Sequence, residues 1–360
     1  MTYHWIDQAP RLAELAGTLP AGAPLFLDTE FMRERTFWPQ LALVQVNAGD
    51  AGVWLIDPPA LADAAPLAGL LAGRPLVMHA CSEDIEALRV FTGVVPASIQ
   101  DTQIAAAFAG HDLQCSYQRL VRELTGTELP KDATRTDWLQ RPLSPQQLAY
   151  ARDDVVWLPE LLSRLQARLD ALGRTAWWQE ECQRQLEASL TETTPDTAWR
   201  QVKGAGNLAG RALARLVVLA RWRDSTARER DLPRGFLVRD PALLALAQEA
   251  PQRRDALAGL DVHPSVVRRD GDTLLALLRE GEQREPPAPL PGPPTPEERA
   301  LIKALRARVA AIAESLGMST DVLMRRRWLE ALVRDPAHPP APLQGWRQDV
   351  ITRPLLEMLP

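Results

Sequence analysis

The sequence predicts a mixed α/β domain followed by two regions built only of helices. Three short apolar runs follow one another within residues 24–56, which indicates an antiparallel group of strands. Strand-like and helix-like runs then alternate as far as residue 172, as expected when a sheet becomes parallel in its later part. From Trp199 onward, apolar residues recur only at helical spacing. A chain of 360 residues is long enough for all three parts.

Proline and glycine set the boundaries of the elements in the α/β part. Pro20 and Gly22 end the first helix, Pro58-Pro59 stops the third strand, and Pro159 is expected to bend the last helix. Residues 126–143 are expected to form a loop with a short helical turn. The predicted elements are a helix at 8–18, strands at 24–28, 41–46 and 52–56, a helix at 61–72, a strand at 75–79, a helix at 82–92, a strand at 98–101, and helices at 102–108, 115–124 and 145–172.

Two breaks in the pattern divide the chain. The apolar periodicity lapses at Thr191–Pro195, and residues 286–294 form a stiff proline-rich stretch. Thr295 then provides an N-cap, with proline and two acids in the first turn of the next helix. We therefore predict domains at 1–194, 195–285 and 296–360, with the proline-rich linker at 286–295.

The composition argues against a membrane-spanning, secreted or disulfide-rich protein. No apolar run is long enough to span a membrane and no secretory signal is recognisable, so we expect a cytoplasmic protein. Three widely spaced cysteines fit a reducing compartment and offer neither a disulfide framework nor a zinc site.

The charge is unevenly distributed along the chain. Residues 1–194 carry 15 Lys and Arg against 25 Asp and Glu, whereas residues 195–285 carry 16 against 13 and residues 286–360 carry 10 against 8. The mildly basic helical parts suit a nucleic-acid partner, and Arg221, Arg223, Arg228, Arg230 and Arg234 form the best candidate basic patch. The net charge of −5 argues against strong non-specific binding.

Asp28 and Glu30 stand at the end of the first predicted strand. Side chains two residues apart on a strand point to the same face, so these two carboxylates would lie side by side. They repel each other unless a proton or cation lies between them, and carboxylate oxygens suit Mg²⁺ or Mn²⁺. The alternative is that Asp28 caps a turn and Glu30 is solvated; the pair alone does not decide between these interpretations.

Three further residues extend this acidic pattern. Asp84 lies in the first turn of a predicted helix, where it could equally well compensate the helix dipole. Tyr150 and Asp154 are four residues apart on a helix and share a face, although Tyr150 could be only a packing residue; Asp153 points elsewhere and is expected to be solvated. Together, four carboxylates could hold two divalent cations for phosphodiester cleavage, while a tyrosine hydroxyl orients the attacking water.

These residues occur in motifs that resemble the ribonuclease D family, in the tyrosine-bearing branch of the DEDD 3′–5′ exonucleases. The motifs are Asp28-Thr29-Glu30-Phe31 followed by Arg33, Thr36, Pro39, Leu41 and Gln45; His79 through Asp84; Asp101-Thr102-Gln103; Arg135-Thr136-Asp137-Trp138; and Tyr150 with Asp154. Trp199, Val202-Lys203-Gly204, Trp222-Arg223, Asp231-Leu232-Pro233-Arg234 and Gly271 to Leu275 resemble an HRDC domain. Residues 296–360 would be a second, more divergent HRDC-like domain.

The resemblance implies a fold, a site and an activity. The fold would be a ribonuclease H-like mixed sheet flanked by helices, followed by two all-α HRDC-type domains. The activity would be 3′–5′ exoribonucleolytic hydrolysis with two Mg²⁺ or Mn²⁺ ions, trimming structured RNA such as tRNA precursors and releasing nucleoside monophosphates. No protein partner is evident.

The resemblance also implies roles for individual residues. The catalytic set would be Tyr150, which positions the water, and four metal ligands acting directly or through water: Asp28, Glu30, Asp84 and Asp154. The residues expected to line the 3′-terminal nucleotide are Thr29, Phe31, Met32 and, as a weaker candidate that could instead be a packed strand-end residue, His79.

Two other functions remain open at the sequence level. A DNA exonuclease would use the same chemistry at the phosphate, and the preference for ribose would depend on contacts to the 2′-hydroxyl. A nucleic-acid-binding module without catalysis is also conceivable, although the intact set of acidic residues argues against it.

Overall fold

The computed structural model describes residues 3–20, 22–130, 136–191 and 193–360. The chain divides into two compact units. The first, which we call the sheet unit, comprises Met1–Met32, Gln40–Leu190 and Pro294–Pro360. The second, the helical unit, comprises Arg33–Pro39 and Thr191–Pro293.

The sheet unit is built on a mixed sheet, as predicted. The described part of the chain forms six strands in the order β1-β4-β3-β2-β5-β6. The pairs β2–β3 and β3–β4 are antiparallel, whereas β1–β4, β2–β5 and β5–β6 are parallel. The strands are β1 Tyr3–Ile6, β2 Leu25–Met32, β3 Gln40–Asn47, β4 Val53–Ile56, β5 Pro75–Met78 and β6 Ser98–Asp101.

Strand β1 was not predicted. It pairs with β4 at the edge of the sheet, and of its four residues only Ile6 is fully buried. A short edge strand with one buried residue shows neither a continuous apolar run nor a clear alternation, so its sequence carries little strand signal.

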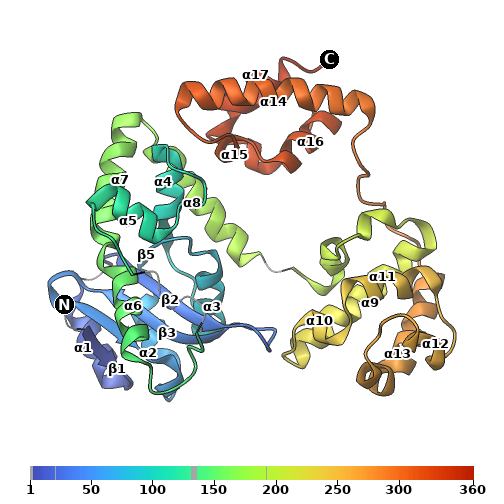
Figure 1. Cartoon of the computed structure of the whole chain (residues 1–360), viewed down its shortest axis with the longest axis horizontal. Coiled ribbons are helices and arrows are strands. Elements are labelled where there is room, and N and C mark those ends of the chain that lie inside the picture. Colours follow the sequence, from blue (N-terminus) through green and yellow to red (C-terminus); the bar gives the residue numbers. More distant parts are fainter. Residues whose placement is uncertain (1–2, 21, 131–135, 192) are drawn as a thin grey trace. The chain divides into compact units, whose positions relative to one another are not determined.

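Helices flank this sheet (Figure 1), and α3 and α6 both pack against β2 and β3. The predicted bend near Pro159 is a break, because α6 ends at Val156 and α7 begins at Leu158. Helix α8 lies where no element was predicted, and the expected loop at 126–143 includes residues 131–135, which lie outside the described part. The helices are α1 Ala9–Thr18, α2 Ala65–Leu71, α3 Ser82–Thr92, α4 Thr102–Ala109, α5 Tyr117–Thr125, α6 Pro145–Val156, α7 Leu158–Leu172 and α8 Thr175–Leu190.

The C-terminal segment of the sheet unit consists of α14 Pro296–Leu316, α15 Thr320–Leu323, α16 Arg326–Arg334 and α17 Arg353–Leu356. The predicted cap of α14 is confirmed, since the Thr295 hydroxyl accepts from the Glu298 amide and the Glu298 carboxylate accepts from the Thr295 amide. The segment shares one apolar core with the helices that flank the sheet.

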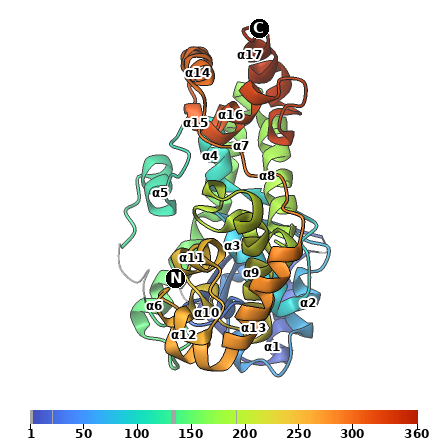
Figure 2. The ribbon, with the colours of Figure 1, turned by 90° about the vertical axis from the view of Figure 1, so that its right-hand side faces the viewer.

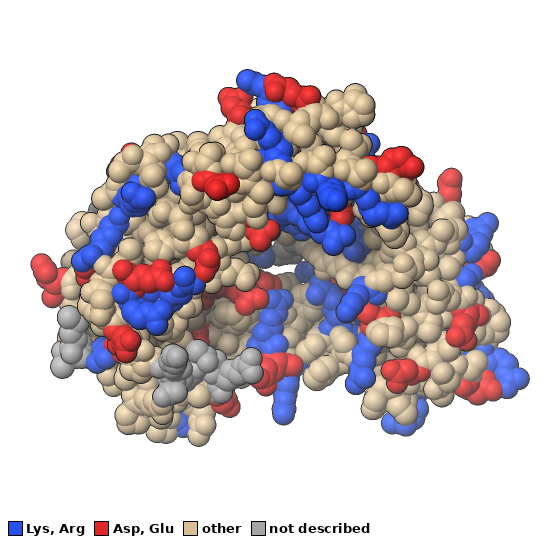
Figure 3. Space-filling view, turned by 45° about the horizontal axis from the view of Figure 1, so that its top comes forward, with Lys and Arg blue, Asp and Glu red and all other residues tan. Residues whose placement is uncertain are grey.

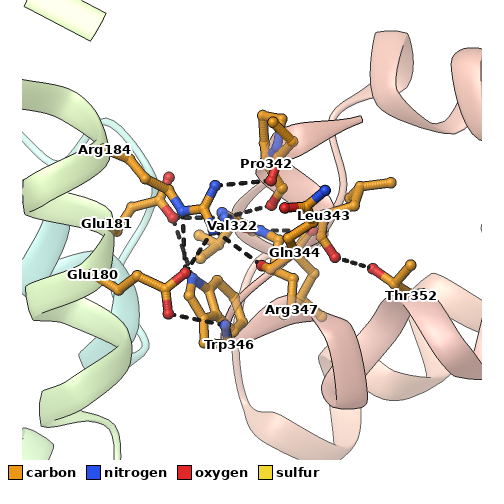
Figure 4. Close-up of polar contacts among 12 residues, drawn as sticks. Glu180, Glu181, Arg184, Val322, Pro342, Leu343, Gln344, Trp346, Arg347 and Thr352 are labelled. Atoms are coloured by element: carbon orange, nitrogen blue, oxygen red, sulfur yellow. Dashed lines mark hydrogen bonds and ion pairs between the residues drawn. The ribbon is translucent and has the colours of Figure 1, made fainter. Parts of the chain in front are cut away.

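Polar contacts tie this segment to α8 (Figure 4). Arg347 is almost fully buried and its Nη1 lies 2.6 Å from Glu181 Oε2, while its other nitrogens donate to the carbonyl oxygens of Val322 and Leu323. The Trp346 amide donates to Glu180 at 3.0 Å. The guanidinium of Arg347 is thus enclosed by acceptors from both parts of the unit.

The helical unit has a core of its own. Its long helices α9 and α13 pack side by side (Figure 2). Segment Arg33–Pro39, which connects β2 to β3, belongs to this unit: the amides of Phe37 and Trp38 donate to Asp231 Oδ1 at 2.9 and 3.0 Å. Its helices are α9 Gly210–Glu229, α10 Arg234–Leu237, α11 Asp240–Glu249, α12 Arg254–Ala258 and α13 Pro264–Gln283.

None of the described helices combines the length and the apolar character that a membrane crossing requires.

Candidate active site

Asp28 and Glu30 lie on the same face of β2, as their spacing predicts. Burial alternates along the strand: Leu25, Leu27 and Thr29 are buried, whereas Asp28 and Glu30 are only half-buried at the surface of the fold. A register irregularity between Glu30 and Phe31 then changes the pairing with β3. The two acids therefore occupy the last regular stretch of the strand.

Asp84 reaches the same region from the first turn of α3. The turn from β5 into α3 passes through Ala80, which adopts the left-handed backbone conformation at φ 59°. The amides of Ala80 and Cys81 donate to the two carboxylate oxygens of buried Asp101, at 3.0 and 3.1 Å. Asp101 also caps α4. It therefore fixes the backbone turn that positions Asp84.

Thr29 connects the first two acidic groups. Its hydroxyl donates to Asp84 Oδ1 at 2.5 Å, and the side chain is buried on the face of β2 opposite Asp28 and Glu30. Thr29 was expected to line the nucleotide pocket. In the structure its side chain supports Asp84, and its role toward the nucleotide stays a prediction.

Helix α6 supplies Tyr150 and Asp154. The helix begins with a capping box formed by Ser144 and Gln147, with Pro145 in its first turn. Asp154 is buried and Tyr150 is half-buried; burial raises the pKa of Asp154, and the neighbouring Tyr150 hydroxyl offsets part of that rise. Asp153, expected to be solvated, is paired with Arg152 at 2.6 Å.

The four carboxylates perturb one another. Burial and then repulsion by Asp84, Asp154 and Glu30 raise the pKa of Asp28 well above its usual range. Burial and repulsion by Asp154 and Asp84 raise the pKa of Glu30 to about 9. Burial is also the main cause that raises the pKa of Asp84 to about 6 and that of Asp154 to about 8.

A divalent cation fits this group of side chains. All the donors are carboxylate oxygens, and no described Lys, Arg or His side chain forms an ion pair with any of them. Within the described residues, no three His, Cys, Asp or Glu side chains converge as a ready-made metal shell.

The tyrosine hydroxyl is also affected by the acidic surroundings. Burial and the charges of Asp154, Glu30 and Asp28 raise the pKa of Tyr150, so the hydroxyl keeps its proton and can donate a hydrogen bond. The ring packs near Trp138, with 6.0 Å between ring centroids. Tyr150 and Asp154 also line a pocket with Gln118, Leu129 and Gln146.

His79 is fully engaged within the fold. Its Nδ1 lies 2.9 Å from Thr102 Oγ1 and its Nε2 lies 2.9 Å from the carbonyl oxygen of Cys115. Burial lowers the pKa of the ring, which stacks edge-on near Tyr117. These contacts favour the packing interpretation of His79. Phe31 and Met32 are half-buried at the end of β2, on the strand that carries Asp28 and Glu30.

Comparisons with known proteins agree with this geometry. Residues 3–170 match a family model described as 3′-5′ exonuclease, and residues 212–278 match the HRDC domain. Ribonuclease D of Pseudomonas paraeruginosa is 40% identical to this chain, with 99% of this chain and 97% of the relative covered. Ribonuclease D of Escherichia coli is 34% identical, with 100% and 99% covered. The chain belongs to the ribonuclease D family.

A solved structure of a ribonuclease D has the same fold. The crystal structure of Escherichia coli RNase D, described as an exoribonuclease involved in structured RNA processing, matches with a TM-score of 0.91 and 33% identity, and all of both chains is covered. The present protein is accordingly a 3′–5′ exoribonuclease with an exonuclease domain followed by an HRDC domain. Its family implies dependence on divalent metal ions.

The five arginines expected to form a basic patch are each paired with an acidic residue of the helical unit. Arg223 is buried against Asp240, and Arg230 pairs with Asp270 at 2.7 Å. The remaining pairs are Arg221 with Asp196, and Arg228 and Arg234 with Asp224. On the face drawn in Figure 3, Lys and Arg gather in one group in the upper middle of the view, and elsewhere they are interspersed with Asp and Glu. The patch stays a prediction, because a count of arginines in the sequence does not show which acids pair with them.

The sequence singled out the four acids that the structure brings together, but not the residues that support them. Asp101 was noticed only as part of a motif and Thr29 only as a residue expected at the nucleotide, and their contacts join elements far apart in the chain. Tyr117 was missed: its hydroxyl donates to the carbonyl oxygen of Asp153 and accepts from the Trp157 amide, both at 3.2 Å. The only local signal was a tyrosine just after the N-cap Ser116.

Proposed function

We propose that this exoribonuclease removes nucleotides one at a time from the 3′ ends of structured RNAs, tRNA precursors among them, and releases nucleoside monophosphates. The observation that carries this proposal is the set of four interacting carboxylates from β2, α3 and α6, with the Tyr150 hydroxyl beside Asp154. The structured substrate is supported by the description of Escherichia coli RNase D, which this chain matches over its whole length.

Asp28, Glu30, Asp84 and Asp154 would hold two divalent cations, Mg²⁺ or Mn²⁺, directly or through water. Bound there, such ions would lower the pKa of a water molecule and stabilise the charge on the leaving oxygen. The protein contributes a rigid arrangement of ligands, because each acid lies on a helix or a strand rather than on a loop. Asp101 and Thr29 act indirectly by positioning Asp84.

Tyr150 would donate its hydroxyl proton in a hydrogen bond to the attacking water. Its place on α6, one turn before Asp154, keeps the hydroxyl next to an acidic ligand. Phe31, Met32 and the backbone of Thr29 would contact the 3′-terminal nucleotide, since they follow or separate the two acids of β2. His79 would contribute only indirectly, through its contacts with Thr102 and Cys115.

A degradation assay tests the substrate. A 5′-labelled tRNA precursor, an unstructured RNA and a DNA of matched sequence are each incubated with enzyme and Mg²⁺ or Mn²⁺. We expect stepwise shortening from the 3′ end of the precursor, with nucleoside monophosphates as products and DNA degraded much more slowly. Equal rates on RNA and DNA, or cleavage only of unstructured RNA, would refute the proposed substrate.

We also propose that residues 296–360 form a second HRDC-like domain, which packs onto the exonuclease fold within one compact unit, and that the domain boundaries lie at 194, 285 and 295. The all-helical composition of this segment supports the assignment. A cytoplasmic location is supported by the RNA substrate and by the free thiols of Cys81, Cys115 and Cys182.

A further inference from the structure

Gln45 is a polar side chain in an apolar strand. It lies in the middle of β3, where its neighbours Leu43, Val44 and Val46 are all fully buried. Gln45 is itself 0% exposed, and neither its Nε2 nor its Oε1 has a hydrogen-bond partner among the described residues. A buried amide without partners costs free energy, so an unpaired glutamine in a sheet requires an explanation.

The register of the sheet places Gln45 beside the candidate active site. Gln45 is the direct partner of Asp28 in the antiparallel pair of β3 and β2. Residues directly opposite each other on such a pair project to the same face, with Cβ atoms about 5 Å apart. The carboxamide of Gln45 and the carboxylate of Asp28 are therefore neighbours on the face that also carries Glu30.

This face is covered by α6. Asn47 lies two residues after Gln45 on β3 and so points to the same side. Its Nδ2 donates to the carbonyl oxygens of Val155 and Val156, at 3.1 and 3.2 Å, in the last turn of α6. Gln45 thus lies in the layer between the sheet and the helix that supplies Asp154.

The chemistry of a carboxamide suits this position. The acids of the site are acceptors when ionised, and a neutral amide offers two N–H donors without adding a positive charge that would compete with a cation. A lysine or arginine here would neutralise Asp28 by itself. A methionine of similar size would fill the volume but donate nothing.

We propose that Gln45 is a positioning residue of this exoribonuclease: when a divalent cation is bound, its Nε2 donates to the Asp28 carboxylate and orients that carboxylate toward the cation. This inference rests on the proposed metal role of Asp28. Outer partners of this kind set the orientation of a ligand, and removing one typically weakens metal binding about 10–100-fold.

The test separates metal affinity from folding stability. Gln45→Met is compared with wild type, with Asp28→Asn and with Val46→Ala, a buried change on the opposite face of the same strand. Mn²⁺ binding is measured by titration calorimetry, and stability by urea unfolding of the metal-free proteins. We expect Gln45→Met to bind Mn²⁺ about 10-fold more weakly while its metal-free form is at least as stable as wild type, because an unpaired buried amide has been removed.

The controls distinguish the possible failures. Val46→Ala should lose stability and keep its Mn²⁺ affinity. If Asp28→Asn weakens Mn²⁺ binding and Gln45→Met does not, the role of Gln45 is refuted while the metal role of Asp28 stands. If Asp28→Asn leaves the affinity unchanged, the proposed metal site itself is refuted.

A second measurement on the unmutated protein does not depend on how the variant folds. With ¹⁵N-glutamine labelling, Mg²⁺ should shift the side-chain amide resonances of Gln45, identified by their absence in Gln45→Met or Gln45→Leu. Resonances that do not respond to saturating Mg²⁺ would overturn the proposal.

Discussion

At the scale of single residues, the candidate site brings like charges together, at a cost in free energy. Four carboxylates from separate elements repel one another, and burial adds to the cost of their charges. The neutral hydroxyls of Thr29 and Tyr150 lower the pKa values of Asp84 and Asp154 in part, but both pKa values stay above their usual range. This repulsion favours the binding of cations, and it makes the free energy of unfolding depend on pH.

Metal-free protein should become less stable as pH rises. The folded-state pKa values of Asp84, Asp154 and Glu30 are about 6, 8 and 9, above their unfolded values near 4, so the folded state binds more protons than the unfolded state. The free energy of unfolding in EDTA should therefore fall between pH 4 and 9, by at least ~2 kcal/mol. Urea unfolding across this range checks the slope.

Two controls accompany this titration. Asp28→Asn removes one charge from the group and should flatten the pH dependence, and Mn²⁺ should restore the stability of wild type at the alkaline end. A metal-free stability that rises with pH over the same range would contradict the electrostatic account.

Replacement of Tyr150 by Phe should slow turnover without weakening RNA binding. The variant keeps the ring that packs near Trp138 and loses only the hydroxyl beside Asp154. We expect kcat to fall about 10²-fold with little change in the Kd for RNA. Single-turnover kinetics and fluorescence anisotropy measure the two quantities, with Tyr3→Phe, at the exposed edge strand, as the control. A parallel loss of binding would instead assign Tyr150 to substrate affinity.

At the scale of secondary-structure elements, the site depends on where β2, α3 and α6 begin and end. The acid spacing on β2, the acidic first turn of α3 and the Tyr150–Asp154 interval on α6 are local patterns, and the sequence alone predicted all three. Strand β1 and helix α8 were missed, because β1 buries a single residue and α8 is mostly polar, with only Trp178, Cys182 and Leu186 buried.

Contacts between distant elements could not be predicted in this way. Asp101 accepts hydrogen bonds from amides of the β5–α3 turn, and Gln45 lies opposite Asp28. Both contacts depend on strand register. A single sequence encodes register only indirectly, through turns and core packing. This explains why the four acids could be singled out in the sequence, whereas the contacts of Asp101 and Gln45 could not be predicted.

The junction of α8 with the C-terminal segment gives a prediction at this scale. Arg347→Ala removes the charged partner of Glu181 and the donors to two buried carbonyl oxygens, so we expect a loss of about 3 kcal/mol in the free energy of unfolding. Arg353→Ala breaks an exposed pair with Asp349 and should cost less than about 0.5 kcal/mol. Urea unfolding of both variants measures the difference; similar small losses would show that the junction is not a buried ion pair.

At the scale of the whole molecule, the chain is not a simple string of domains. Residues 294–360 share a core with the exonuclease fold, although the HRDC-matching region lies between them in sequence. The β2–β3 connection, in turn, belongs to the helical unit through Asp231. The compact units therefore interleave along the chain.

A truncation tests this organisation. A chain ending at Pro291 loses Trp346, whose ring packs against Phe108 and stacks on Trp177 at 5.0 Å. The exposed apolar surface should lower the Tm of the sheet unit and increase the binding of a hydrophobic dye. If residues 294–360 were an independent appendage, calorimetry would show an unchanged transition for the remaining protein.

The central claim is that the four carboxylates form the hydrolytic site, and single-turnover cleavage of a 5′-labelled RNA by Asp28→Asn and Asp154→Asn tests it most directly. With saturating Mn²⁺ and unfolding curves confirming that both variants fold, the account predicts that removal of the 3′ nucleotide slows by at least about 10³-fold in each. Cleavage by either variant at a rate close to wild type would contradict the assignment.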